Sequence, residues 1–196
     1  MSKKIAIISV TYGQNESLKC FINSIKSQTN PNWVLYIIHD GYNEDLENDL
    51  KINGYLNDKV KFISHPERTS NYGHKLRKWS LENLELYDYV LLTNGDNYYT
   101  PNMVDEVLKN DTDLIYFSCV HSHKNKKNHN KSSYGFMDCQ LIESNIDMGC
   151  VIIESKLSKT IGFNYTTYSA DWEYFNEILS LNPTVTKIDK ILFVHN

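Results

Sequence analysis

The sequence predicts an α/β protein with a mainly parallel central sheet and helices on both faces. Short apolar stretches bounded by polar turns recur along the chain, as is typical of strands that are buried on both sides. Amphipathic stretches lie between them, and a helix is the usual crossover between parallel neighbours. Repeated strand and helix units of this kind favour a layered α/β architecture.

The elements of the first half follow one another closely. Residues 4–10, "KIAIISV", form the first expected strand, and Asn15 can cap a helix that ends before Pro31. Residues 33–39, "WVLYIIH", form a second buried strand. A less regular helix leads from there to a short strand at residues 59–64.

The alternation continues through the middle of the chain. Residues 72–86 have helical spacing of apolar residues, and residues 89–97, "YVLLTNGDN", form the next strand. Pro101 stands where a helical turn begins, and residues 112–120 are another strand.

The last third of the sequence is less regular. A strand is expected to enter a helix that closes at Gly162, and residues 171–181 form a helix with Trp172, Phe175 and Leu179 on one side. Two short strands, "TVTKID" and "ILFVHN", are expected to finish the chain.

Composition narrows the classes of function. A chain of 196 residues with 41% hydrophobic residues can bury the core of one domain. The net charge of -4 argues against a nucleic-acid partner, because such proteins usually carry a basic face. No apolar run approaches the ~18 residues of a membrane span, so we expect no integral membrane segment and a cytoplasmic protein.

Cysteine usage favours reduced thiols in the core. The four cysteines form no C-x-x-C pair and lie among apolar residues. A zinc site is the alternative, although its spacings are looser than those of most structural zinc sites. Its ligands would be Cys119, His121, His123 and Cys139.

The polar segment "HSHKNKKNHNKSSYG", residues 121–135, interrupts the strand and helix pattern. It has too few apolar residues to order itself strongly. Two interpretations stay open: a solvated surface loop, or a lid that contacts the acceptor and orders on binding.

Polar residues follow three of the predicted strands. They are Thr11 and Tyr12, then His39 and Asp40, then Asn94, Gly95, Asp96 and Asn97. Ligands of open α/β sheets bind outside the carboxyl ends of the strands, so these groups can hold a base, a ribose and a metal-bridged diphosphate. A carboxylate such as Asp96 suits Mg²⁺ or Mn²⁺, and a glycine beside it lets a phosphate approach the backbone. A simple turn is the alternative for "NGDN".

Five motifs, in this order, resemble a known family. They are "ISVTYGQNESLKCFINSIKSQT", "LYIIHDGYNED", "YVLLTNGDNYYTP", "MGCVII" and "ADWEYF". Together they resemble the inverting glycosyltransferases of family two, which have the GT-A fold, and the resemblance spans nearly the whole chain. It implies a single GT-A domain over residues 1–196, with a nucleotide-binding half at 1–100 and an acceptor-side half at 101–196.

The resemblance also implies the substrates and the cofactor. A nucleoside-diphosphate sugar, expected to be a UDP-sugar, donates its sugar to a hydroxyl acceptor such as a glycan, with Mn²⁺ or Mg²⁺ as cofactor. Neither the sugar nor the acceptor is fixed by a motif. Many relatives have a long C-terminal extension, so the chain can be one catalytic domain of a larger protein.

Roles at the nucleotide follow position by position. The resemblance places Tyr12 near the uracil and Asp40 on the base, with His39 in place of the first member of an acidic pair. Arg77 matches a basic residue that approaches the diphosphate. Asp96 matches the last carboxylate of the metal-binding D-x-D motif, and Asn94 replaces the first.

Roles at the reacting sugar are implied in the same way. Asp171 matches the general base at the start of a helix, with a helix N-cap as the alternative role, and Glu173 is a weaker candidate for the base. His195 lies where many GT-A enzymes place a metal-binding histidine.

Two other classes compete with this interpretation. A sugar nucleotidyltransferase would share the architecture but needs a glycine-rich loop after the first strand, which "SVTYGQNES" lacks. A catalytically silent sugar-nucleotide-binding module fits the substitutions at His39 and Asn94.

Overall fold

The computed structural model describes residues 2–13, 15–122 and 134–196. Within them one sheet has the strand order β3-β2-β1-β4-β8-β6-β9-β5, with β7 paired to β6. Its strands are β1 (Ile5–Thr11), β2 (Trp33–His39), β3 (Val60–Ser64), β4 (Tyr89–Asn94), β5 (Tyr98–Tyr99), β6 (Leu114–His121), β7 (Gly135–Met137), β8 (Val151–Glu154) and β9 (Val185–His195).

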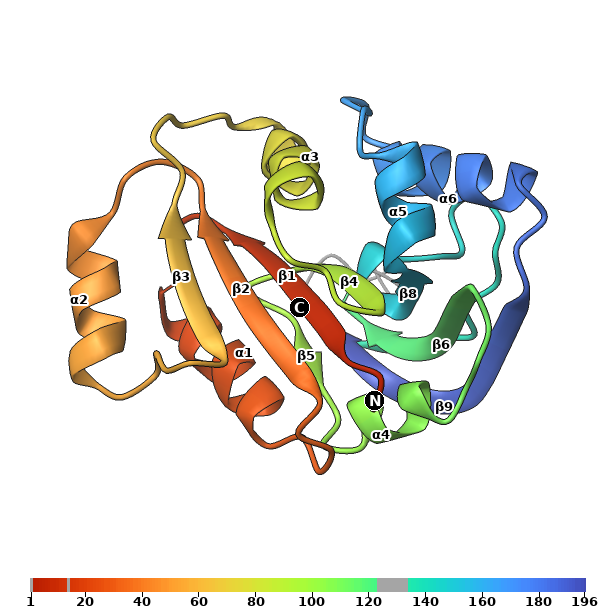
Figure 1. Ribbon diagram of the computed structural model, residues 1–196, viewed down its shortest axis with the longest axis horizontal. Helices are drawn as coiled ribbons and strands as arrows, with labels where there is room; N and C mark the ends of the chain where they lie inside the picture. Colours follow the sequence, from red (N-terminus) through yellow and green to blue (C-terminus); the bar gives the residue numbers. More distant parts are fainter. Residues whose placement is uncertain (1, 14, 123–133) are drawn as a thin grey trace.

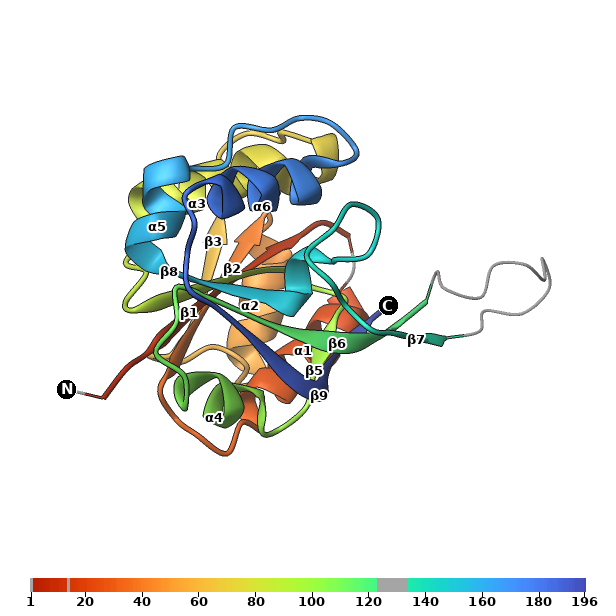
Figure 2. The same cartoon turned by 90° about the vertical axis from the view of Figure 1, so that its right-hand side faces the viewer.

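Helices cover both faces of this sheet, which confirms the predicted α/β class. In Figure 2, α3, α5 and α6 lie on one face, whereas α1 and α4 lie on the other. The helices are α1 (Asn15–Lys26), α2 (Glu44–Ile52), α3 (His74–Asn83), α4 (Met103–Leu108), α5 (Ser155–Ile161) and α6 (Ala170–Ser180). Two short 3-10 turns, η1 (Asn71–Gly73) and η2 (Met148–Cys150), precede α3 and β8.

The first half of the sheet is parallel, as the sequence predicts. Strands β3, β2, β1 and β4 are neighbours in that order and all run the same way (Figure 1). Thr11 pairs with His39 and Val10 with Asn94, so these strand ends lie at one edge. The backbone register therefore brings the predicted polar residues together.

The second half of the sheet is mixed. Strand β8 runs antiparallel to both β4 and β6, whereas β6 and β9 are parallel. Apolar runs look the same in either direction, so the sequence pattern could not distinguish the two arrangements. The two short strands expected at the end of the chain are one long strand, β9, whose register against β6 shifts next to Ser118.

Helix faces agree with the sequence pattern to different degrees. The buried residues of α1 are the predicted ones, Leu18, Phe21, Ile22 and Ile25. In α6 the buried face instead holds Tyr174, Phe175 and Ile178, while Trp172 and Leu179 are only half-buried. The Tyr174 hydroxyl lies 2.5 Å from that of Ser158 in α5, and this buried polar contact sets the rotation of α6.

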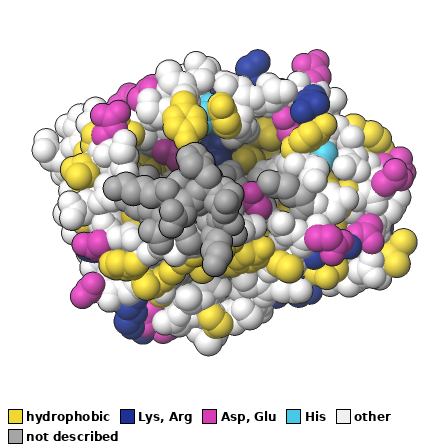
Figure 3. All heavy atoms as spheres, turned by 180° about the vertical axis from the view of Figure 1, so that it is seen from behind, with side chains coloured by type: hydrophobic (Ala, Val, Ile, Leu, Met, Phe, Trp, Pro, Cys, Tyr) yellow, Lys and Arg dark blue, Asp and Glu magenta, His cyan; other side chains and the backbone are white. Residues whose placement is uncertain are grey.

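Charges on the surface are mixed with apolar groups. On the face seen in Figure 3, acidic and basic side chains are scattered among hydrophobic and uncharged ones. No helix in the described part of the chain has both the length and the apolar character to cross a membrane. The lid proposed for residues 121–135 falls mostly outside the described residues, as does His123 of the alternative zinc site.

Candidate active site

Two adjoining pockets lie along the edge where the parallel strands end. The first has a volume of about 370 Å³, and its lining includes Thr11, Tyr12, Asp40, Arg68, Asn94 and Asp96. The second, of about 690 Å³, includes Arg77, His121, Asp147, Asp171 and His195. Tyr72 and Asn94 line both pockets, so the two spaces share a wall.

Gly95 fixes the packing at the floor of the first pocket. Its N–H donates to the Val10 carbonyl at 3.0 Å. A Cβ atom at this position would lie 3.0 Å from the Thr11 side chain and 3.1 Å from Leu18. A small residue at this position therefore favours close packing of β1, β4 and α1, and the approach of a phosphate to Gly95 stays a prediction.

Asp40 forms hydrogen bonds to the loop that lines the first pocket. One carboxylate oxygen accepts from the Thr69 N–H at 2.6 Å and from its hydroxyl at 2.9 Å, and the other accepts from the Ser70 N–H at 2.8 Å. The next residues form a left-handed turn, with φ of 53° at Ser70, 54° at Asn71 and 56° at Tyr72. Such backbone is unfavourable for residues other than glycine and needs external support.

Tyr12 and Arg68 form a platform at the mouth of the first pocket. The Arg68 guanidinium lies 3.9 Å from the centre of the Tyr12 ring, which is 50% exposed. A flat exposed ring backed by a cation suits stacking against a nucleobase. Arg68 was missed in the sequence, because it stands in a loop whose path depends on Asp40.

His39 is buried, and both of its ring nitrogens form hydrogen bonds to other residues of the chain. Its Nδ1 donates to the Gly41 carbonyl at 2.9 Å, so its Nε2 accepts from the Asn43 amide at 3.2 Å. The Asn43 side chain also accepts from the Leu46 N–H and so caps α2. His39 lines neither pocket, whereas the sequence predicts that it contacts the nucleotide.

Arg77 is a buried cation between the two pockets. Its Nη2 donates to the Asn94 side-chain oxygen at 2.6 Å, and its Nη1 donates to the Tyr72 carbonyl at 2.7 Å. Its Nε is buried and has no partner among the described residues. Burial lowers the pKa of Arg77, while the negative charges of Asp171 and Asp147 act in the opposite direction.

Asp171 lies in the second pocket, on the first turn of α6. The N-cap of this helix is Ser169, so the alternative of Asp171 as the N-cap is wrong. Its carboxylate instead accepts from the Met148 N–H across the pocket, at 3.3 Å. Burial raises the pKa of Asp171 to about 6, opposed by the charge of Arg77. A carboxylate of this basicity is suited to proton transfer near neutral pH.

The contacts of Glu173 indicate a different role from that of Asp171. Its carboxylate accepts from the Ser169 hydroxyl at 3.0 Å and from the Thr167 hydroxyl, both in the segment before α6. It is not part of the lining of the second pocket. These contacts favour Asp171 over Glu173 as the base.

Two histidines and one carboxylate converge at the far side of the second pocket. The His121 and His195 rings stack with centres 4.0 Å apart. Their Nε2 atoms lie 3.6 Å and 3.8 Å from the same oxygen of Asp147. Burial opposes the charge of Asp147, but the contact with His121 and the charge of His195 keep its pKa low.

This group fits a divalent cation. One ligand atom from each of the three residues lies within 4.8 Å of the others. Imidazole and carboxylate together suit Mn²⁺ and related ions. His195 was a predicted ligand of the donor's cation, His121 was named only as a ligand of the alternative zinc site, and Asp147 was missed. Asp96, the other predicted ligand, lines the first pocket and not the second.

Searches against known proteins connect this architecture to one class. No family model matches the sequence. A sequence relative from Acanthamoeba polyphaga mimivirus, an uncharacterized glycosyltransferase R139, is 32% identical over 110 residues, 49% of this chain and 42% of the relative. Hyaluronan synthase of Streptococcus pyogenes is 28% identical over 130 residues, 64% of this chain and 30% of the synthase. The chain thus spans less than half of either relative.

Solved structures with a similar fold agree with the sequence relatives. The S. aureus TarS 1-349 complex with UDP-GlcNAc matches with a TM-score of 0.72 and 17% identity over 97% of this chain and 58% of TarS 1-349. The mannosyltransferase PcManGT from Pyrobaculum calidifontis, in complex with GDP-Man and Mn²⁺, matches with a TM-score of 0.73 and 12% identity. That match covers 100% of this chain and 57% of PcManGT.

The chain therefore has the GT-A fold of glycosyltransferases, and its sequence relatives are named as a glycosyltransferase and a hyaluronan synthase. The predicted fold class and the predicted resemblance to glycosyltransferases are confirmed. The division into halves at residue 100 stays a prediction.

Proposed function

We propose that the chain is an inverting glycosyltransferase that moves a sugar from a nucleoside-diphosphate sugar to a hydroxyl acceptor. The observation that carries this proposal is Asp171, a carboxylate with a pKa of about 6 in the second pocket, which shares a wall with the first pocket. The relatives named as glycosyltransferases support it.

The donor would lie across both pockets. In the first, the ring of Tyr12, backed by Arg68, would stack on the base, and a uridine nucleotide is favoured because neighbouring structures include UDP complexes. Thr11 lines this pocket, and its buried hydroxyl has no partner among the described residues. The buried Arg77 would then stabilise the diphosphate as it leaves.

Asp171 would act on the acceptor. As an anion near neutral pH it would take the proton of the acceptor hydroxyl while that oxygen attacks the anomeric carbon. The bond from that carbon to the diphosphate breaks in the same step, so the configuration is inverted. The Met148 N–H holds the carboxylate in place during this transfer.

A divalent cation would be held in the second pocket by His121, Asp147 and His195, whose ligand atoms fit one ion. Bound there, it would supply positive charge to the leaving diphosphate. Asp96 stays a proposed contributor from the first pocket, where it is the carboxylate of the "NGD" turn. Mn²⁺ in the PcManGT complex makes this the first ion to test.

The acceptor is proposed to be a carbohydrate. Tyr72 and Tyr168 line the second pocket, are 69% and 90% exposed, and their ring centres lie 6.1 Å apart. Exposed rings at a pocket mouth offer flat apolar surfaces that can stack on a sugar ring, while the pocket's amides and carboxylates can bind its hydroxyls.

The test compares Asp171→Asn with the wild type in donor hydrolysis and sugar transfer. Loss of the base lowers turnover by about 10²- to 10⁴-fold, while donor binding, measured by calorimetry, is retained. Asp105→Asn on the exposed side of α4 is the matched control and keeps full activity. Donor binding without turnover in the wild type would instead establish the silent binding module.

A further inference from the structure

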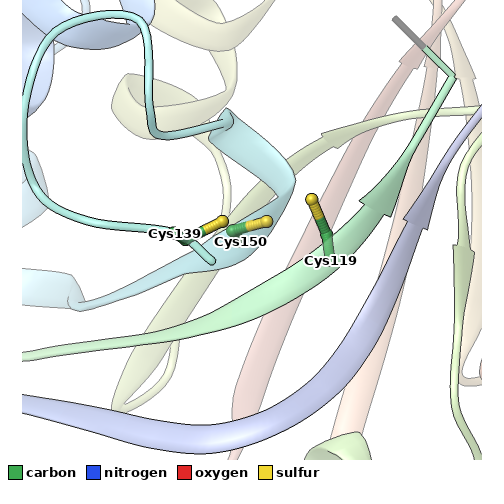
Figure 4. Close-up of side chains that lie close together, drawn as sticks. All are labelled: Cys119, Cys139 and Cys150. Carbon is green, nitrogen blue, oxygen red and sulfur yellow. The ribbon is translucent and has the colours of Figure 1, made fainter. Parts of the chain in front are cut away.

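Three cysteines that lie far apart in the sequence meet in the core. Cys119 lies in β6, Cys139 follows β7, and Cys150 ends η2. One sulfur atom from each lies within 4.8 Å of the other two. Figure 4 shows the three side chains, which come from three separate stretches of the chain, with their sulfur atoms close together.

These sulfur atoms are closed off from solvent. All three residues are 0% exposed, and all three are free thiols. The fourth cysteine, Cys20 in α1, is exposed. Buried free thiols normally act as small apolar groups, and each then packs among hydrocarbon. Here each thiol instead faces two others.

We propose that Cys119, Cys139 and Cys150 form a binding site for one soft, thiophilic cation of the Zn²⁺ and Cu⁺ class. Three sulfur ligands select such ions, whereas Mg²⁺ and Mn²⁺ prefer oxygen and nitrogen. Each cysteine that binds as a thiolate releases its proton, and the cation offsets part of the negative charge that remains.

The site is separate from the ligands proposed for the donor's cation. Those ligands are His121, Asp147 and His195, which provide nitrogen and oxygen only. The two groups are nevertheless neighbours in the fold, because His121 follows Cys119 by two positions in β6 and Asp147 precedes Cys150 at η2.

A cation among the sulfurs would stiffen one wall of the second pocket. That pocket is lined by Met137, Met148 and Gly149. In the sequence, Cys139 comes two positions after Met137, and Cys150 comes directly after Gly149. The Met148 N–H donates to Asp171. Joining β6 to the 147–150 turn would therefore hold the backbone that positions Asp171.

The probe is Cd²⁺, which gives an ultraviolet charge-transfer band only when sulfur is bound. The chain is reduced with a phosphine, which adds no competing thiol, freed of metal by chelation, and titrated. The expected band saturates at one equivalent of Cd²⁺ and is lost on adding Zn²⁺ or Cu⁺, but survives excess Mg²⁺ and Mn²⁺.

Variants assign the band to the cluster. Cys139→Ser and Cys139→Ala should lose it, while Cys20→Ser, the matched control, and His195→Ala keep it. Circular dichroism checks that each variant is folded. Absence of the band in the folded wild type, or an equal band in both Cys139 variants, would overturn the proposal. Because no sugar transfer is measured, this result is independent of the proposed activity.

Discussion

At the residue scale, Asp171 stands between two opposing influences. Burial favours its neutral form, whereas the charge of Arg77 favours its anion, and the balance leaves the pKa at about 6. The same Arg77 also donates to Asn94.

The activity is expected to depend on this pKa. The plot of kcat/KM against pH for the wild type should rise through about pH 6 as Asp171 ionises, because only the anion accepts a proton. Initial rates at acceptor concentrations well below KM, taken at several pH values, measure this. A flat profile across that range would argue against Asp171 as the base.

The contribution of Asp171 to the free energy of unfolding should fall as the pH rises, whereas the activity should increase. The pKa of Asp171 is higher in the folded chain than in the unfolded one, so its contribution to the free energy of unfolding is full at about pH 4 or below and is lost as the pH rises through about 6. Asp171→Asn does not titrate. The melting temperature of the wild type relative to this variant should therefore fall between about pH 4 and pH 7, as differential scanning calorimetry can show.

At the element scale, two features build the pockets: the left-handed turn before α3 and the pairing of β6 with β9. The turn is held from one side by Asp40 and from the other by Arg77, through the Tyr72 carbonyl. The strand pairing sets His121 directly opposite His195. A shift of one residue would turn His195 to the other face of the sheet.

Asp40→Asn tests the turn. An amide cannot accept from the Thr69 and Ser70 N–H groups on both of its terminal atoms, so one buried donor is left without a partner. We expect a loss of about 1–3 kcal/mol in the free energy of unfolding, together with weaker donor binding. Urea unfolding and calorimetry measure the two effects. Asp189→Asn, an exposed site in β9, is the control, and equal stability of both variants would refute the role given to Asp40.

His195→Ala tests the cation ligands. Mn²⁺ should raise the melting temperature of the wild type, because an ion that binds only the folded chain stabilises it. The variant should lose most of this shift, since one of three converging ligands is gone. His65→Ala, at a half-buried histidine near α3, is the matched control. A Mn²⁺ shift that survives in His195→Ala would place the ion elsewhere, with Asp96 as the next candidate.

At the scale of the whole molecule, the two pockets draw on different parts of the sheet. Among the described residues, those that line the first pocket fall between Val10 and Asp96, in the parallel part. The second also takes residues from the loops around β8, α6 and β9. A ligand that extends through both would connect the two parts.

Nucleotide binding should therefore stabilise the whole chain. At a concentration of about 100 times its Kd, UDP is expected to add about 2.7 kcal/mol to the free energy of unfolding. The shift in melting temperature should be larger for UDP with Mn²⁺ than for UDP with a chelator, and larger than for ADP. Equal shifts under all three conditions would contradict both base selectivity and a bridging ion.

The sequence by itself determined the features that are local. Strands β1, β2 and β4 and the polar residues at their ends follow from continuous apolar runs that stop at turn residues. These patterns depend on neighbours within a few positions. The resemblance to glycosyltransferases, carried by the order of the motifs, added the role expected of Asp171.

Only the tertiary structure decided which distant residues meet. The antiparallel insertion of β8, the pairing of His121 with His195, and the cluster of Cys119, Cys139 and Cys150 all depend on strand order and register across long stretches of chain. Local propensity carries no information on register, because a buried strand looks alike beside any apolar partner. The same holds for Asp40, whose carboxylate is taken by Thr69 and Ser70, and for Arg68, which reaches Tyr12 only because that loop is held.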